Sequence, residues 1–133
     1  VYVLLGDGEM QEGSNWEALM LVNALKLDNL VVIIDRNNRQ ISDKVENIVP
    51  LGELKLKLES FGFHAVEVDG HDIGQITAAL KQNNASPLAV IAQTVKGKGL
   101  SFVEDAENWH GRALSDHEWE IAKKELGIQE EML

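Results

Sequence analysis

Polar residues with cation-binding chemistry follow the first two apolar runs of the sequence. The first run leads into Gly6-Asp7-Gly8, and the second ends at Asp35, with Asn37 two residues later. A carboxylate and a carboxamide oxygen are hard ligands that Mg²⁺ or Ca²⁺ accepts, with the oxygens of a bound diphosphate completing the shell. The two glycines let the backbone turn sharply and approach a ligand closely. These residue types are therefore compatible with a cation and phosphate site.

The spacing of the two loops decides between this hypothesis and a simpler one. Gly, Asp and Asn are common turn residues, so either motif alone is typical of an ordinary polar turn at a strand end. However, 28 residues separate Gly8 from Asn37, the length of one β-α-β crossover. Such a crossover brings both loops to the same edge of a parallel sheet, where ligands bind at the carboxyl ends of the strands. We therefore expect one shared pocket.

The elements that must position these loops follow from the hydrophobic pattern. Short apolar runs alternate with amphipathic stretches, which is typical of an α/β fold with a mostly parallel sheet. The runs are continuous in hydrophobicity, so we expect helices on both faces of the sheet. The predicted strands are Val1–Leu5, Leu30–Asp35, Ala65–Val68 and Leu88–Gln93. The predicted helices are Ser14–Leu25, Leu51–Ser60, Ile73–Asn83 and a terminal one from about Asp116 to Leu126.

Local signals mark the ends of these helices. Ser14, with a glutamate three residues later, forms a capping-box pattern at the first helix. His71 and Asp72 are expected to begin the third helix. Ser115 precedes acids that suit the positive end of the last helix, and Gly127 is expected to end it.

Composition limits the class of protein. The 133 residues, 44% of them apolar, predict one domain with a hydrophobic core, here a partial diphosphate-binding domain over 1–133. The 22 acids against 12 bases argue against nucleic acid, and no apolar run is long enough for a membrane span. The absence of cysteine excludes disulfides and thiolate metal sites. Because no signal segment is present, we expect a cytoplasmic protein, and the start inside a strand predicts a fragment of a longer chain.

Motifs along nearly the whole chain resemble the transketolases, a family of thiamine-diphosphate enzymes. They are Gly6-Asp7-Gly8-Glu9-Met10-Gln11-Glu12-Gly13, Trp16-Glu17-Ala18, Lys26-Leu27-Asp28-Asn29-Leu30, Val68-Asp69-Gly70-His71-Asp72, Lys96-Gly97-Lys98-Gly99 and Trp109-His110-Gly111-Arg112-Ala113-Leu114. The form around His110 looks closest to the separately encoded N-terminal subunits of split transketolases. The resemblance implies the thiamine-diphosphate-binding fold, with thiamine diphosphate and Mg²⁺ or Ca²⁺ as cofactors.

The resemblance also implies the cation ligands. The side chains of Asp7 and Asn37 correspond to family ligands, and the backbone carbonyl of Arg39 corresponds to a third. The family often has an acid or asparagine at the position of Arg36 and a glycine at that of Asn38. Asparagine adopts left-handed backbone angles more readily than most residues, so this difference is compatible with a cation site. The role of Arg36 stays open.

Other pocket residues follow from the same resemblance. Gly6, Gly8 and Glu9 would shape the loop that holds the diphosphate. Ile41 resembles an apolar residue near the cofactor, although an isoleucine is more often plain core. Glu12 resembles a glutamate of an acid network across the subunit interface, with a solvated loop carboxylate as the alternative.

His110 resembles the histidine of the family that faces the channel between diphosphate and substrate. That histidine hydrogen-bonds a sugar hydroxyl or assists proton transfer, whereas a lone histidine is ordinarily a surface or core residue. The segment 96–99 is not a Walker loop, because Lys98 is followed by glycine. We expect it to be a flexible turn near the mouth of the active site.

The implied reaction transfers a two-carbon ketol unit from a ketose phosphate to an aldose phosphate. The implied partner is a pyrimidine-binding transketolase domain or C-terminal subunit, in a homodimer or heterotetramer. The fragment alone is expected to be inactive. The alternatives are another thiamine-diphosphate enzyme, such as a deoxyxylulose-phosphate synthase or an oxo-acid dehydrogenase component, and a non-catalytic subunit-interaction domain. The sequence leaves open which sugars react and whether the parent protein is split.

Overall fold

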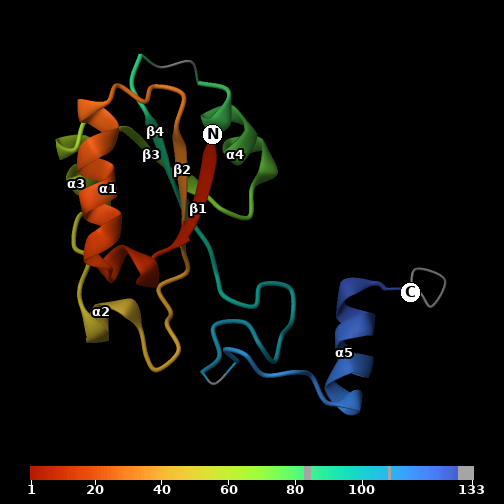
Figure 1. Ribbon diagram of the computed structural model, residues 1–133. Helices are drawn as coiled ribbons and strands as arrows, with labels where there is room; N and C mark the ends of the chain where they lie inside the picture. The colour runs from red at the N-terminus through yellow and green to blue at the C-terminus, as the bar shows by residue number, and fades with distance from the viewer. Residues whose placement is uncertain (83–84, 108, 129–133) are drawn as a thin grey trace.

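The chain folds into a four-stranded, all-parallel sheet between helices (Figure 1). The computed structural model describes residues 1–82, 85–107 and 109–128. The strands, in the spatial order β1-β2-β4-β3, are β1 Tyr2–Gly6, β2 Val31–Arg36, β3 His64–Asp69 and β4 Leu88–Gln93. The helices are η1 Gly8–Gln11, a 3₁₀ turn, then α1 Gly13–Ala24, α2 Val45–Ile48, α3 Leu54–Ser60, α4 Ile73–Leu80 and α5 Asp116–Leu126.

All four predicted strands are present, and β4 has the predicted bounds. β1 and β2 begin and end one residue later than predicted. β3 is one residue longer at each end, because its ladder with β4 includes the polar residues His64 and Asp69. β1 and β2 are neighbours, as the single crossover predicts. Their shared edge is the position expected for the two polar loops.

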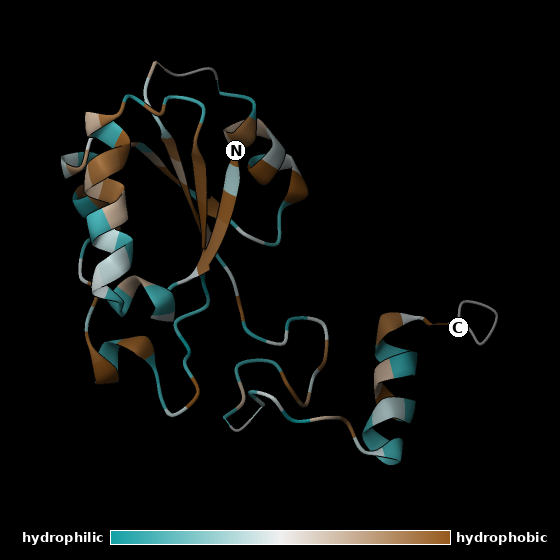
Figure 2. Cartoon of the chain, in the orientation of Figure 1, coloured by the Kyte–Doolittle hydropathy of each residue, from teal (hydrophilic) through white to brown (hydrophobic). Residues whose placement is uncertain are grey.

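Two apolar clusters cover the two faces of the sheet, which confirms the prediction of helices on both sides. On one face Val32 and Ile34 of β2 belong to a buried cluster with residues of α1 and α3. On the other face Val31 and Ile33 pack against the cluster that includes Ala79 of α4. Figure 2 shows these strands as a mostly hydrophobic centre between the helices.

Three helix predictions were wrong in detail. Ser14 does not cap α1, because η1 leads directly into the helix and Glu12 takes the N-cap position without a side-chain cap bond. The helix predicted over 51–60 begins only at Leu54, because Gly52 has a left-handed φ of 57° that an α-helix does not continue through. The short helix α2 before it was not predicted. Helix α4 ends at Leu80, and its predicted end at Asn83 lies outside the described residues.

The predicted signals at α4 and α5 are confirmed. Asp72 accepts a hydrogen bond from the N–H of Gln75 at 3.1 Å and caps α4. Ser115 and Glu118 form a capping box at α5, and Gly127 ends that helix with a φ of 65°. The Ser115 hydroxyl, followed by the guanidinium of Arg112, lowers the pKa of Glu118 to about 2.

Two further features concern the outer surface. The segment after β4, residues 94–107 and 109–128, extends away from the sheet and ends in α5 (Figure 1); we call it the arm. Apolar side chains of β1 and α1 are also exposed: Tyr2, Leu4, Met20 and Leu21 are all more than half exposed. Within the described ranges, no helix is long and apolar enough to cross a membrane.

Candidate functional site at the carboxyl edge of the sheet

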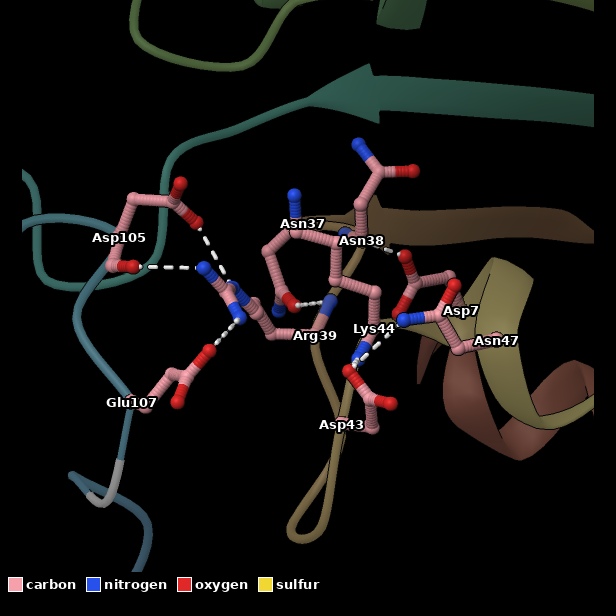
Figure 3. Close-up of polar contacts among 9 residues, drawn as sticks. All are labelled: Asp7, Asn37, Asn38, Arg39, Asp43, Lys44, Asn47, Asp105 and Glu107. Atoms are coloured by element: carbon pink, nitrogen blue, oxygen red, sulfur yellow. Dashed lines mark hydrogen bonds and ion pairs between the residues drawn. The ribbon is translucent and has the colours of Figure 1, made fainter.

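The loops after β1 and β2 lie side by side. Gly6 pairs with Asp35 in the strand register, and the N–H of Asp7 donates to the Asp35 carbonyl at 3.0 Å. The N–H of Asn38 donates to the Asp7 carboxylate at 2.6 Å and joins the two loops (Figure 3). The crossover therefore brings the two polar motifs together, as their spacing predicts.

Asp7 stands out because its carboxyl group is buried, with 1% of the residue exposed. Burial raises its pKa, and the N–H groups of Asn38 and Gly8 oppose that rise by hydrogen bonding, while the neighbouring Asp35 adds to it. A buried carboxylate that is not paired with a cation is unfavourable. A bound divalent cation would offset that cost, so the residue fits the predicted ligand role.

The amide of Asn37 is oriented by hydrogen bonds from both sides. Its Nδ2 donates to Asp35 Oδ2 at 3.3 Å, and its Oδ1 accepts from the N–H of Arg39 at 2.9 Å. Thr94 donates its hydroxyl hydrogen to the other oxygen of Asp35. An amide oxygen has two lone pairs, so Asn37 Oδ1 keeps one acceptor position for a cation. Asn38 adopts the left-handed conformation predicted for it, with a φ of 59°.

The glycine loop is shaped by close approach. A Cβ on Gly8 would lie 2.9 Å from Cγ of Gln40, so a side chain there would displace the side chain of Gln40. Glu9 accepts a hydrogen bond from the N–H of Gly6 at 2.6 Å. This contact agrees with the loop-shaping role predicted for Glu9.

A pocket of about 950 Å³ opens at this edge and contains every predicted site residue. Residues from five segments line it: Gly6, Asp7, Gly8, Glu9, Asp35, Asn37, Arg39, Gln40, Ile41, Ser42, His71, Thr94, Val95, Lys96, Gly97, Lys98 and His110. Ile41 is 73% exposed, so the alternative that it belongs to the core is wrong. A turn is present over 96–99 beside this pocket, as predicted.

Two residues with proposed or open roles lie outside the pocket. Arg36 Nη1 lies 3.8 Å from Glu67 Oε1, which gives a partly exposed ion pair at the end of β2. Such pairs contribute little stability. Glu12 is exposed at the N-cap of α1, and its interface role stays a prediction.

Two basic side chains in the pocket were missed as site residues. Lys96 Nζ lies 3.4 Å from Nδ1 of His110, so a cation stands beside the predicted substrate-facing histidine. His71 Nε2 accepts a hydrogen bond from the N–H of Val95 at 2.8 Å, which places the proton of the neutral ring on Nδ1. The sequence signal for Lys96 was its motif, but nothing local shows that its side chain meets His110.

The donor set is oxygen-rich and contains few acids. Within the part of the chain that the structure describes, no group of three or more His, Asp or Glu residues is arranged to hold a metal ion. A cation at this edge therefore depends on one carboxylate together with amide and carbonyl oxygens, and on oxygens of a ligand. Fold and pocket together define an α/β protein with a ligand site at the carboxyl edge of a parallel sheet, suited to a phosphate-bearing ligand and a hard cation.

Comparison with known proteins identifies the family. The family model for the thiamine diphosphate binding domain of transketolase matches residues 1–133, and the chain belongs to this family. Human transketolase is 46% identical over 114 residues, which are 86% of this chain and 18% of that protein. One subunit of the apulose-4-phosphate transketolase of Actinobacillus succinogenes is 42% identical over 128 residues, 95% of this chain and 46% of that relative.

Solved structures agree with this assignment. The transketolase of Campylobacter jejuni superposes with a TM-score of 0.88 at 34% identity, covering 95% of this chain and 20% of that one. The fold predicted by the resemblance is therefore confirmed. The chain spans less than half the length of each of these relatives.

Proposed function

We propose that this chain is the diphosphate-binding part of a transketolase that transfers a two-carbon ketol unit from a ketose phosphate to an aldose phosphate. The observation that carries the proposal is the single pocket that gathers all the predicted site residues, in a chain of this family. Thiamine diphosphate supplies an electron sink for carbon–carbon bond cleavage when bound. The protein supplies position and charge.

The predicted cation ligands are the Asp7 carboxylate, the Asn37 amide oxygen and the backbone carbonyl of Arg39. The burial of Asp7 and the orientation of Asn37 support this set, because hydrogen bonds within the chain hold both groups in place. The cation, Mg²⁺ or Ca²⁺, would neutralise the diphosphate in a chain whose formal net charge is -10.

His110 is proposed to face the substrate. It lies at the pocket on the arm, next to Lys96, and its imidazole suits hydrogen bonding to a sugar hydroxyl or proton transfer near neutral pH. The neighbouring ammonium group of Lys96 adds a positive charge that suits a phosphate-bearing substrate.

The proposed partner is a pyrimidine-binding transketolase domain or C-terminal subunit, in a homodimer or heterotetramer. Relatives named as single subunits of apulose-4-phosphate transketolases support an arrangement of separate chains. The exposed apolar side chains of β1 and of α1 are also typical of positions that other protein covers.

The experiment compares the purified chain with the assembly that contains its partner. We expect ketol transfer, followed with ketose and aldose phosphates, only from the assembly supplied with thiamine diphosphate and Mg²⁺. Measurable transfer by this chain without a pyrimidine-binding partner would contradict the proposal, as would an assembly that binds the cofactor without catalysing transfer.

A further inference from the structure

Arg39 connects the predicted cation site to the arm. Its N–H donates to Asn37 Oδ1 at 2.9 Å, so its main chain is held beside a predicted cation ligand. Its side chain is only 10% exposed and points the other way, toward Asp105 and Glu107 (Figure 3). Arg39 therefore contacts the predicted cation loop through its main chain and the arm through its side chain.

The contacts of the Arg39 guanidinium concentrate on Asp105. Nε donates to Asp105 Oδ1 at 2.8 Å, and Nη2 donates to the Asp105 backbone carbonyl at 2.8 Å. Nη1 lies 3.7 Å from Oε1 of Glu107, which is a longer contact to a more exposed group. Two short hydrogen bonds from one planar guanidinium group fix the orientation of Asp105 as well as its distance, which a lysine ammonium does not do.

Asp105 in turn holds the part of the arm that carries the basic pocket residues. Its N–H donates to the Lys96 carbonyl at 2.8 Å. Its backbone is left-handed, with a φ of 51°, a conformation that aspartate and asparagine tolerate better than most other residues. Lys96 Nζ lies 3.4 Å from His110 Nδ1. A continuous set of contacts thus runs from Asn37 to Arg39, on to Asp105 and Lys96, and from Lys96 to His110.

We propose that Arg39 and Asp105 form a clasp that positions Lys96 and His110 at the pocket that the predicted cation ligands also line. The two residues are positioning residues, since they act through the arm. The inference rests on the proposed function and adds that a residue of the cation loop holds, through its side chain, the segment that carries the substrate-facing histidine.

The test uses the complete assembly with three variants. Asp105→Asn removes the negative charge, while asparagine still tolerates the left-handed backbone. Arg39→Lys keeps the positive charge but loses the planar guanidinium group, and Arg39→Gln loses both the charge and the guanidinium group. We expect Asp105→Asn and Arg39→Gln to lower kcat/KM for the donor ketose phosphate about tenfold, the effect of losing a charge-assisted hydrogen bond. The Kd of thiamine diphosphate with Mg²⁺ should change less than about threefold, and Arg39→Lys should restore only part of the loss.

Two controls separate the clasp from general destabilisation. Glu107→Gln, in the same segment, should change kcat/KM at most about twofold, because its contact is long and exposed. Lys55→Gln removes a surface pair with Glu59 on α3 and should change neither constant. The double variant Arg39→Gln/Asp105→Asn should be no worse than Arg39→Gln, because both changes remove the same interaction.

Hydrogen exchange gives a readout that does not depend on activity. Amides of the arm over 94–107 should exchange about tenfold faster in Asp105→Asn, with β4 unchanged as a check on folding. Unchanged exchange, unchanged kcat/KM, or equal losses of cofactor affinity and kcat/KM would each overturn the clasp. A wild-type assembly without ketol transfer would instead refute the proposed function, while the exchange result would still decide whether the clasp holds the arm.

Discussion

Replacing Gly70 by alanine is expected to destabilise the protein and to weaken cofactor binding, although Gly70 does not line the pocket. A Cβ at this position would overlap Cγ2 of Thr94 and would lie 3.0 Å from the carbonyl oxygen of Gln93 and 3.1 Å from Cβ of Ala92. Gly70 cannot retreat easily, because its N–H donates to that Gln93 carbonyl at 2.7 Å. Thr94 must therefore move.

The displacement of Thr94 reaches the predicted cation site through two hydrogen bonds. Thr94 donates to one oxygen of Asp35, and the other oxygen accepts from the Asn37 amide at 3.3 Å. Overpacking of this kind costs about 1–3 kcal/mol. Binding of a cation by Asn37 would require Thr94 to return to its original position. The overpacking energy is then the largest possible loss of binding free energy, which corresponds to a Kd increase of about 5- to 150-fold.

Denaturant unfolding measures the stability change, and calorimetry of thiamine diphosphate with Mg²⁺ measures the change in affinity. Thr94→Ser removes the overlapping methyl group but keeps the hydroxyl, so the double variant should recover most of both losses. Gly13→Ala is the control, since a Cβ there meets nothing within 4 Å. Wild-type cofactor affinity in Gly70→Ala, or a double variant in which the serine restores neither stability nor affinity, would refute this coupling between Gly70 and the cation site.

Three further predictions concern the site and the arm. Asp7→Asn and Asn37→Ala should each weaken Mg²⁺-dependent cofactor binding in the assembly by at least about 10-fold, because losing a residue that only supports a metal ligand already costs about 10- to 100-fold; unchanged calorimetric affinity in both would place the cation elsewhere. His110→Ala should lower turnover or donor affinity by about 100-fold and change cofactor affinity less; the opposite ranking in steady-state kinetics and calorimetry would indicate a structural role. The pKa of Glu118 is lowered from 4.5 to about 2, mainly by the Ser115 hydroxyl, so its stabilisation of α5 is present above pH 4.5 and lost as the pH falls toward 2. Hydrogen exchange of α5 should show this acid sensitivity in the wild type, and Glu118→Gln should abolish it.

Much of the fold was predictable because it depends on local hydrophobic pattern. Buried parallel strands are continuous apolar runs, so all four were found, and the caps at Ser115 and Gly127 act within one helical turn. The failure at Ser14 has a physical cause. A serine with a glutamate three residues later caps a helix only if the helix begins directly after the serine. Because η1 precedes α1, the helix begins at Gly13 and the N-cap position falls on Glu12.

The site was predictable where it depends on motifs and not where it depends on packing. Asp7 and Asn37 follow consecutive neighbouring strands, so one crossover was enough to place their loops together. His71 was interpreted only as part of a helix start, and Lys96 only as part of a turn. Their roles in the pocket depend on contacts with Val95 and His110, which no local pattern encodes.

The sequence by itself determined the α/β class, the order of the strands along the chain and the polar chemistry at the ends of β1 and β2, because these follow from side-chain types at short separations. Only the tertiary structure decided what supports that chemistry. Pairing of β4 between β2 and β3 brings Thr94 to Asp35, 59 residues away, and the return of the arm brings Asp105 to Arg39, 66 residues away. Contacts at such separations arise from how the whole sheet packs, and hydrophobic periodicity contains no information about them.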